Sequence, residues 1–212
     1  MKRKNKTQSV GSRHFSFKRL SKLLDRICKE ERRVATGVLR SVIELAIEIA
    51  REGREGRRIG TMFVVGDEQN VLAYSRPLIL DPLQGHGADV KHIDDPNMRE
   101  TAKELAQLDG AFVISNAGVI LSATRHLDAH SQEIDLPLGL GSRHFAAASI
   151  TRHTDAVSVV VSESAVVRVF DDGQLIAEII PELWLLQRVG ASITEATIAK
   201  IKEENAISKN KC

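Results

Sequence analysis

The stretch Leu105-Ala-Gln-Leu-Asp-Gly-Ala-Phe-Val-Ile-Ser115 joins the end of a predicted helix to a short apolar run. Asp109 and Gly110 stand at the junction, where an Asp-Gly pair is typical of a turn. The apolar run that follows is typical of a buried strand. This junction is either an ordinary turn or a ligand site, since the ends of sheet strands often present carboxylates and free amides to ligands.

Helical and strand-like segments surround this junction. Apolar residues recur at helical spacing over residues 15–51 and 97–108, with Asn97 as the expected N-cap of the second helix. Further helices are expected over 141–151 and 193–205. The strand-like runs, bounded by glycines or turn residues, are 61–65, 71–75, 111–115, 119–123, 156–162 and 166–170. The first two are expected to pair as a hairpin.

This order of segments predicts an α/β fold. A mixed central β-sheet would have helices packed on both sides and would follow an N-terminal helical segment. The charged, glycine-rich residues 51–58 have no apolar face and divide the chain. We therefore expect a polar tail and helical appendage over 1–55 and the main domain over 56–212. The appendage either completes the core of that domain or controls assembly of an oligomer.

Composition narrows the class of protein. The chain has 212 residues and a net charge of +2, which is too mild to indicate nucleic-acid binding. Its two cysteines, Cys28 and Cys212, fit neither a disulfide framework nor a zinc site. A signal peptide and a membrane-spanning run of about 18 apolar residues are both missing from the sequence. We expect a cytoplasmic protein that binds neither membrane nor nucleic acid.

A second segment, Gly139-Leu-Gly-Ser-Arg-His-Phe-Ala-Ala-Ala148, has the pattern of an anion site. Gly141 permits close backbone approach, and Ser142 could cap a helix whose free amides attract anions. Arg143 offers a fork of donors suited to phosphate, and His144 adds another donor. The Gly-Lys-Ser/Thr ending of a Walker A loop is missing. Alone, the segment is also an ordinary helix start.

Taken in order, these segments resemble the diadenylate cyclase domain family over roughly residues 57–180. The Asp-Gly-Ala motif of the family corresponds to residues 109–111, and its Gly-x-Arg-His-Arg motif to residues 141–145. A Thr-Asp-Ala strand that ends in Ser-Glu corresponds to residues 154–163. The second arginine of the Arg-His-Arg motif is Phe145 here, and Arg125 or Arg152 is a candidate to replace it.

The resemblance implies a nucleotidyltransferase that condenses two ATP into the second messenger cyclic di-AMP and two pyrophosphates. The active site would form between two facing subunits of a homo-oligomer, with Mg²⁺ or Mn²⁺ as cofactor. The implied catalytic residues are Asp109, Gly110, Arg143 and His144; the implied nucleotide-binding residues are Ala111, Leu127, Gly141, Ser142 and Ser162; the implied metal ligands are Asp109 and Glu163.

Two other functions compete with this one. Phe145 favours a nucleotide-binding sensor of the same fold that is catalytically weak or inactive. The spacing of His126 and His130 would suit a zinc hydrolase, but the segment that contains them does not have a helical pattern, so the spacing carries little weight.

Overall fold

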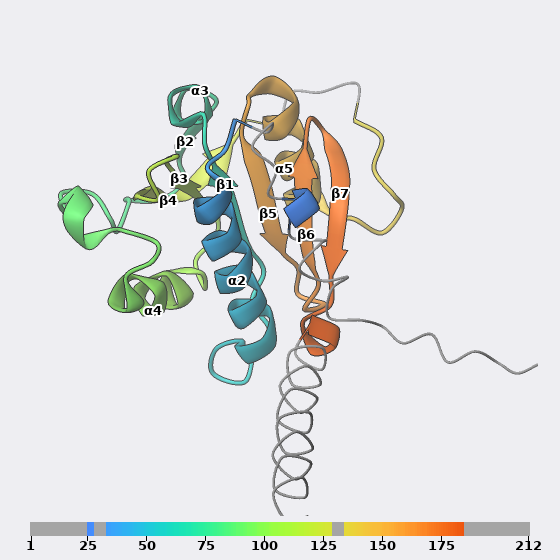
Figure 1. Cartoon of the computed structure of the whole chain (residues 1–212), viewed down its shortest axis with the longest axis horizontal. Helices are drawn as coiled ribbons and strands as arrows, with labels where there is room; N and C mark the ends of the chain where they lie inside the picture. Colours follow the sequence, from blue (N-terminus) through green and yellow to red (C-terminus); the bar gives the residue numbers. More distant parts are fainter. Residues whose placement is uncertain (1–24, 28–32, 129–133, 185–212) are drawn as a thin grey trace, which may run out of the picture.

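A computed structural model describes residues 25–27, 33–128 and 134–184, and its centre is a seven-stranded mixed sheet (Figure 1). The spatial order is β2-β4-β3-β1-β5-β6-β7. The strands are β1 (Thr61–Val65), β2 (Ser75–Pro77), β3 (Ala111–Ile114), β4 (Ile120–Leu127), β5 (Val157–Val161), β6 (Val167–Asp171) and β7 (Gln174–Ile179). β1 and β3 run parallel, whereas the other neighbours are antiparallel.

Helices cover both faces of this sheet, which confirms the predicted α/β fold. They are α2 (Thr36–Glu52), α3 (Glu68–Ala73), the 3₁₀ turn η2 (Ala88–Val90), α4 (Pro96–Leu105) and α5 (Ser142–His153). Successive side chains of β1 point to opposite faces. Phe63 belongs to the apolar cluster shared with α2 and α4, whereas Met62 belongs to the cluster shared with α5. The sheet therefore has one core on each side.

α2 is an integral part of one core. Leu39, Val42, Ile43 and Leu45 are at most 1% exposed and pack in the same cluster as the inner residues of β1 and β5. Each such side chain contributes about 1.5–3 kcal/mol through burial. For residues 36–52, this packing is what the first interpretation of the N-terminal helices, completion of the domain core, requires. The division at residues 55 and 56 stays a prediction.

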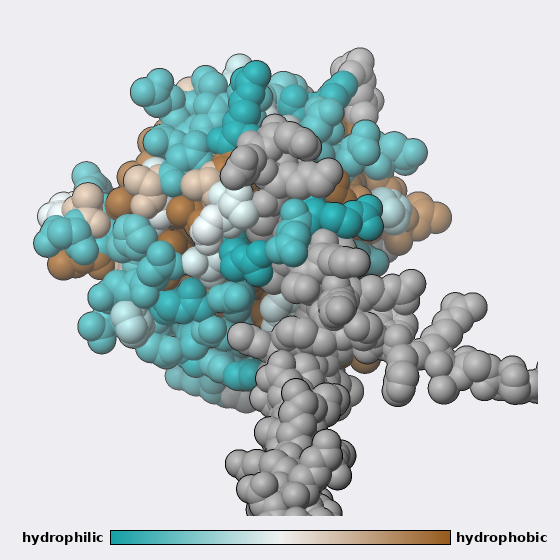
Figure 2. Space-filling view, viewed as in Figure 1, coloured by the Kyte–Doolittle hydropathy of each residue, from teal (hydrophilic) through white to brown (hydrophobic). Residues whose placement is uncertain are grey.

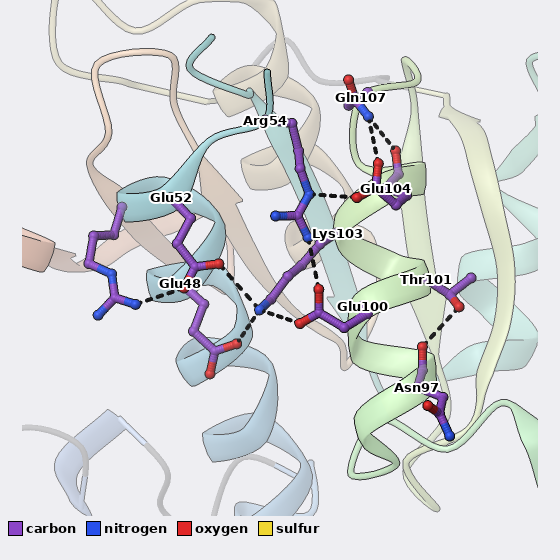
Figure 3. A network of polar contacts seen from close by, with 10 residues as sticks. Glu48, Glu52, Arg54, Asn97, Glu100, Thr101, Lys103, Glu104 and Gln107 are labelled. Carbon is purple, nitrogen blue, oxygen red and sulfur yellow. Dashed lines mark hydrogen bonds and ion pairs between the residues drawn. The ribbon is translucent and has the colours of Figure 1, made fainter. Parts of the chain in front are cut away.

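A network of ion pairs joins α2 to α4 (Figure 3). The Nζ atom of Lys103 lies 2.8 Å from Glu100, 3.1 Å from Glu48 and 3.4 Å from Glu52, and the lysine side chain is only 9% exposed. Burial lowers the pKa of Lys103, but hydrogen bonds to Glu100 and Glu48 outweigh it and leave the pKa above its usual value. Arg54 adds a contact of 3.1 Å to Glu100. The network holds the two helices together over the core.

The predicted hairpin of residues 61–65 and 71–75 is wrong. Residues 68–73 form α3, and β2 pairs with β4 instead of β1. The reason is topological, because both edges of β1 are already taken by β3 and β5. A strand at 71–75 would have had no free edge on β1 with which to pair.

Smaller differences concern the ends of elements. α4 begins at Pro96, and its N-cap is Asp95, whose carboxylate accepts from the Met98 amide at 2.9 Å, so the expected cap Asn97 is wrong. β7 was not predicted. Its half-exposed burial pattern gives a weak strand signal. The expected helix over 193–205 and His130 lie outside the described residues.

The surface is mainly hydrophilic over α2 and α4 in the view of Figure 2, and hydrophobic residues gather at the end formed by the loop between β2 and α4. Leu78, Ile79, Leu80 and Val90 in this loop are exposed. Within the ranges that the structure describes, every helix is too short or too polar to cross a membrane.

Candidate active site

Three segments meet at one end of the sheet: residues 109–111, 162–163 and 141–144. Because β1 is parallel to β3 and antiparallel to β5, the start of β3 and the end of β5 reach the same edge. The first turn of α5 lies over this edge and brings Arg143 between two carboxylates. Arg143 Nη2 is 4.0 Å from Asp109 Oδ1, and Arg143 Nη1 is 4.0 Å from Glu163 Oε1. The structure thus brings together Asp109, Arg143 and Glu163.

Both contacts of Arg143 are long. At 4.0 Å neither is a hydrogen bond, so the two nitrogens keep donor capacity for another acceptor. The Asp109 and Glu163 side chains are 86% and 76% exposed, whereas that of Arg143 is 29% exposed. A partly buried cation between two open carboxylates can bind a phosphate and can support a metal ion beside it.

Gly60 makes room for this arginine, and sequence reasoning missed it. A Cβ atom at Gly60 would lie 2.3 Å from Arg143 Nη1 and 3.2 Å from Glu163 Cγ. A side chain at this position would therefore displace the guanidinium. The signal in the sequence was a glycine directly before a buried strand, which is read equally well as a strand boundary.

The structure gives a packing reason for a glycine at position 110, which the sequence did not reveal. Its φ is +108°, and a Cβ atom there would lie 2.5 Å from the carbonyl carbon of Thr124. Thr124 itself has φ +55°, at an irregularity in the pairing of β3 with β4. The backbone of β4 thus fills the space beside Gly110, so that only a glycine fits there. This close packing sets the position of Asp109, the residue before it.

The start of α5 is open. Gly141 is the N-cap, with no side-chain cap bond, and Ser142 is the first helical residue, so the expected capping by Ser142 is wrong. Both residues are exposed, and a Cβ atom at Gly141 would meet nothing within 4 Å. The His144 amide donates to Gly141 O at 3.0 Å, whereas the amides of Ser142 and Arg143, the first two of the helix, lie before its first hydrogen bond. These amides point toward the helix start and suit an anion.

His144 is buried instead of open to this edge. It is 8% exposed, and its Nε2 lies 3.3 Å from Arg168 Nη1 on β6. Burial, then the charges of Arg168 and Arg143, lower the pKa of His144, and Glu178 opposes them. Arg168, which no sequence motif indicated, therefore contacts this histidine directly.

The three remaining predicted residues are parts of the frame around the site. The Ser162 hydroxyl lies 2.7 Å from Ser164 Oγ and accepts from the Val166 amide at 3.2 Å, so it holds the turn after β5. Ala111 and Leu127 are 0% and 4% exposed in the apolar cluster beneath α5. Their predicted contact with a nucleotide is neither tested nor favoured by this burial.

Neither arginine considered as a replacement at position 145 lies in the cluster. Arg125 donates from Nε to Ser75 Oγ and from Nη2 to Ser75 O, both at 2.8 Å, which ties β4 to β2. Arg152 pairs with Asp172 at 2.6 Å near the other end of α5. It lines a polar cavity of about 650 Å³ that opens at the opposite edge of the sheet from Arg143.

The residues present fit a divalent cation in one specific way. Among the residues that the structure describes, no three His, Cys, Asp or Glu side chains converge as a complete metal cage. Mg²⁺, however, is commonly held by one or two carboxylates together with the phosphates of a nucleotide. Asp109 and Glu163, both open and both beside the phosphate-binding candidate Arg143, match that pattern.

Comparison with known proteins identifies a family and several relatives. The family model described as DisA bacterial checkpoint controller nucleotide-binding (DAC) matches residues 48–175. A diadenylate cyclase from Methanocaldococcus jannaschii is 48% identical over 149 residues, which make up 70% of this chain and 47% of that protein. A diadenylate cyclase from Haloferax volcanii is 43% identical over 153 residues, or 72% and 56% of the two chains. The chain spans about half the length of these curated relatives.

Two solved structures are more distant. A double mutant of DacA from Staphylococcus aureus has a TM-score of 0.44 and 24% identity, covering 70% of this chain and 90% of that one. A hypothetical membrane spanning protein from Bacillus cereus has a TM-score of 0.45 and 19% identity, covering 65% and 59%. At scores this low, the likeness carries no argument about the site.

Proposed function

The chain belongs to the DAC family, the nucleotide-binding domain of the DisA bacterial checkpoint controller, and from that premise we propose that it is a diadenylate cyclase. It would condense two ATP into cyclic di-AMP and release two pyrophosphates. The observation that carries the proposal is Arg143, placed between the open carboxylates of Asp109 and Glu163 at the free start of α5. The identity of 43–48% to two proteins named diadenylate cyclase supports the same reaction.

The start of α5 and Arg143 would bind the phosphates of ATP. Helix amides supply oriented donors without any rearrangement, and a guanidinium neutralises charge that develops on the α-phosphate and the departing pyrophosphate. Asp109 Oδ1 lies 4.0 Å from Nη2 of that arginine, and the Asp109 side chain is 86% exposed. It would accept the proton of the attacking 3′-hydroxyl or hold a metal ion beside it.

A divalent cation would sit between Asp109, Glu163 and the phosphates. When bound, it supplies positive charge that the pyrophosphate needs in order to leave. The chain's own part is to keep both carboxylates exposed on either side of Arg143, close enough to share a ligand with it. Mg²⁺ and Mn²⁺ both suit such oxygen ligands.

The reaction requires two nucleotides in line, and one site per chain holds one. We therefore propose a homo-oligomer in which two subunits face each other with the edge that carries Arg143, because symmetric pairing positions two identical substrates. ATP is the substrate in this proposal, and a cytoplasmic location, without membrane or nucleic-acid binding, is part of it. Activity per subunit should rise with protein concentration if the oligomer dissociates on dilution.

The test is incubation of the full chain with ATP and either Mg²⁺ or Mn²⁺, followed by mass detection of cyclic di-AMP. Wild-type protein should form the product, and Arg143→Ala should form about 10³-fold less. Absence of product from folded wild-type protein with both metals, across protein concentrations, would overturn the proposal. An inactive sensor of the same fold is not favoured, since both curated relatives are named as cyclases.

A further inference from the structure

Arg168 on β6 forms a chain of contacts with Glu178 and His144. Its Nε lies 2.6 Å from Glu178 Oε1, and its Nη1 lies 3.3 Å from His144 Nε2. The arginine side chain is 14% exposed. A cation buried this far is costly unless its donors are used, and here a carboxylate takes one and a histidine ring nitrogen another.

The sheet itself sets the place of this arginine. Arg168 pairs in register with Val160 on β5 and with Glu178 on β7, and Val160 pairs with Met62 on β1. Met62 in turn pairs with Ala111, the residue two places after Asp109. Arg168 therefore stands in the row of residues that crosses the sheet beneath α5, three strands away from the start of β3.

The contact selects one form of the histidine ring. A guanidinium has only donors, so the nitrogen of His144 that faces it must be an acceptor. In the neutral ring the proton then lies on Nδ1. That nitrogen is buried and has no hydrogen-bond partner within the described parts of the chain. An unpaired buried donor is rare in folded proteins, and beside an open anion site it points to a group that a ligand completes.

We propose that Arg168, oriented by Glu178, is a positioning residue that holds His144 as a neutral ring with its proton on Nδ1, next to the phosphate-binding start of α5. This rests on the proposed function and adds to it a residue outside the recognised motifs. The charged groups that face the ring are Arg143 from α5, Arg168 from β6 and Glu178 from β7. The burial of the ring and the two arginines favour the same neutral state.

The first test needs no turnover. Full-length protein labelled with ¹⁵N-histidine is titrated by NMR, and His144→Gln identifies the signals of His144. Wild type should show the proton on Nδ1. In Arg168→Met the pKa of His144 should rise by about one pH unit, because one of the charges that lower it is gone. Arg152→Met, which removes an arginine with an equally short ion pair to Asp172, should leave the signals of His144 unchanged.

Glu178→Gln provides a milder second variant at the sheet edge. The guanidinium loses its carboxylate partner, so we expect a mixture of the two neutral tautomers in place of one. A proton on Nε2 in the wild type would overturn the proposal. Equal His144 signals in Arg168→Met and Arg152→Met would also overturn it, and if Arg168→Met does not fold, an unaltered tautomer in Glu178→Gln would do so.

The second test links the ring to the reaction. The acid side of the kcat/KM profile for ATP should move to higher pH in Arg168→Met by the same amount as the NMR titration, and in Arg152→Met it should not move. A shifted titration with an unshifted profile would show that the state of His144 does not matter for turnover, and the positioning role would fail. Wild-type protein without product would overturn the proposed reaction alone, because the NMR result stands independently of it.

Discussion

Two clusters of charged side chains in this molecule use the same residue types in opposite ways. Lys103, between α2 and α4, is 9% exposed and has three carboxylates within 2.8–3.4 Å (Figure 3). Arg143, at the start of α5, has two carboxylates at 4.0 Å, and both of these are more than three-quarters exposed. The first cluster is complete, and the second has unused donors and acceptors.

This difference separates a structural ion network from a candidate site. A network that is complete and partly buried gains little from a ligand and loses stability when one member is removed. A cluster that is loose and open contributes little to stability, since exposed ion pairs are worth about 0–1 kcal/mol, but it can bind what it lacks. Mutations in the two clusters should therefore have opposite effects on stability and activity.

The largest effect is expected from Arg143→Ala. Cyclic di-AMP formation should fall by about 10³-fold, because the only cation of the Asp109–Arg143–Glu163 cluster is lost at the phosphates. The free energy of unfolding should change by less than about 0.5 kcal/mol. Product assay and urea denaturation on the same preparation measure both. A parallel loss of stability would place Arg143 with Lys103 as a structural residue.

The next effect is expected from Gly110→Ala. An added methyl group would meet the backbone of Thr124 at 2.5 Å in a backbone conformation that alanine rarely adopts. We expect a loss of about 3 kcal/mol of unfolding free energy, together with reduced activity because Asp109 shifts. Gly141→Ala is the matched control, since its Cβ would meet nothing within 4 Å, and it should lose no more than about 1 kcal/mol, the usual cost of alanine at an N-cap. Equal stability of the two variants would contradict the packing argument.

A smaller effect, on stability alone, is expected from Lys103→Met. The substitution keeps the apolar stem but leaves Glu48, Glu52 and Glu100 without their shared cation. We expect a loss of about 2 kcal/mol, less than for a fully buried pair because the carboxylates reach solvent. Product formation per folded molecule should stay within about twofold of wild type. A selective loss of activity would show that the α2–α4 network acts on the site.

The sequence predicted the parts of this comparison that depend on local patterns. β1 was predicted at its observed bounds, and α5 within two residues of them, because a buried apolar run and a small-residue helix have strong local signals. Asp109, Arg143 and Glu163 were selected from motif resemblance, and the sheet topology brings them together.

Other parts depend on contacts across the chain and could not be predicted. Gly60 leaves room for Arg143, which lies more than eighty positions later in the sequence. Arg168 contacts His144 because β6 passes under α5. The hairpin of residues 61–75 failed for the same reason, since the partners of β1 are distant strands. Local periodicity has no information on which distant segment takes an edge or approaches a side chain.

The smallest expected effect is the pH dependence of the complete network. Burial raises the pKa of Glu52, but hydrogen bonds and charge from Arg51 and Lys103 outweigh it and leave the pKa lowered. A carboxyl whose pKa is lower in the folded state stabilises the fold above its unfolded pKa and loses that contribution as the pH falls through the folded value. The advantage of wild type over Lys103→Met should therefore shrink below about pH 4. Urea unfolding at pH 7 and pH 3.5 measures this, and a difference that stays constant would mean that the advantage of Lys103 does not come from its ion pairs with these carboxylates.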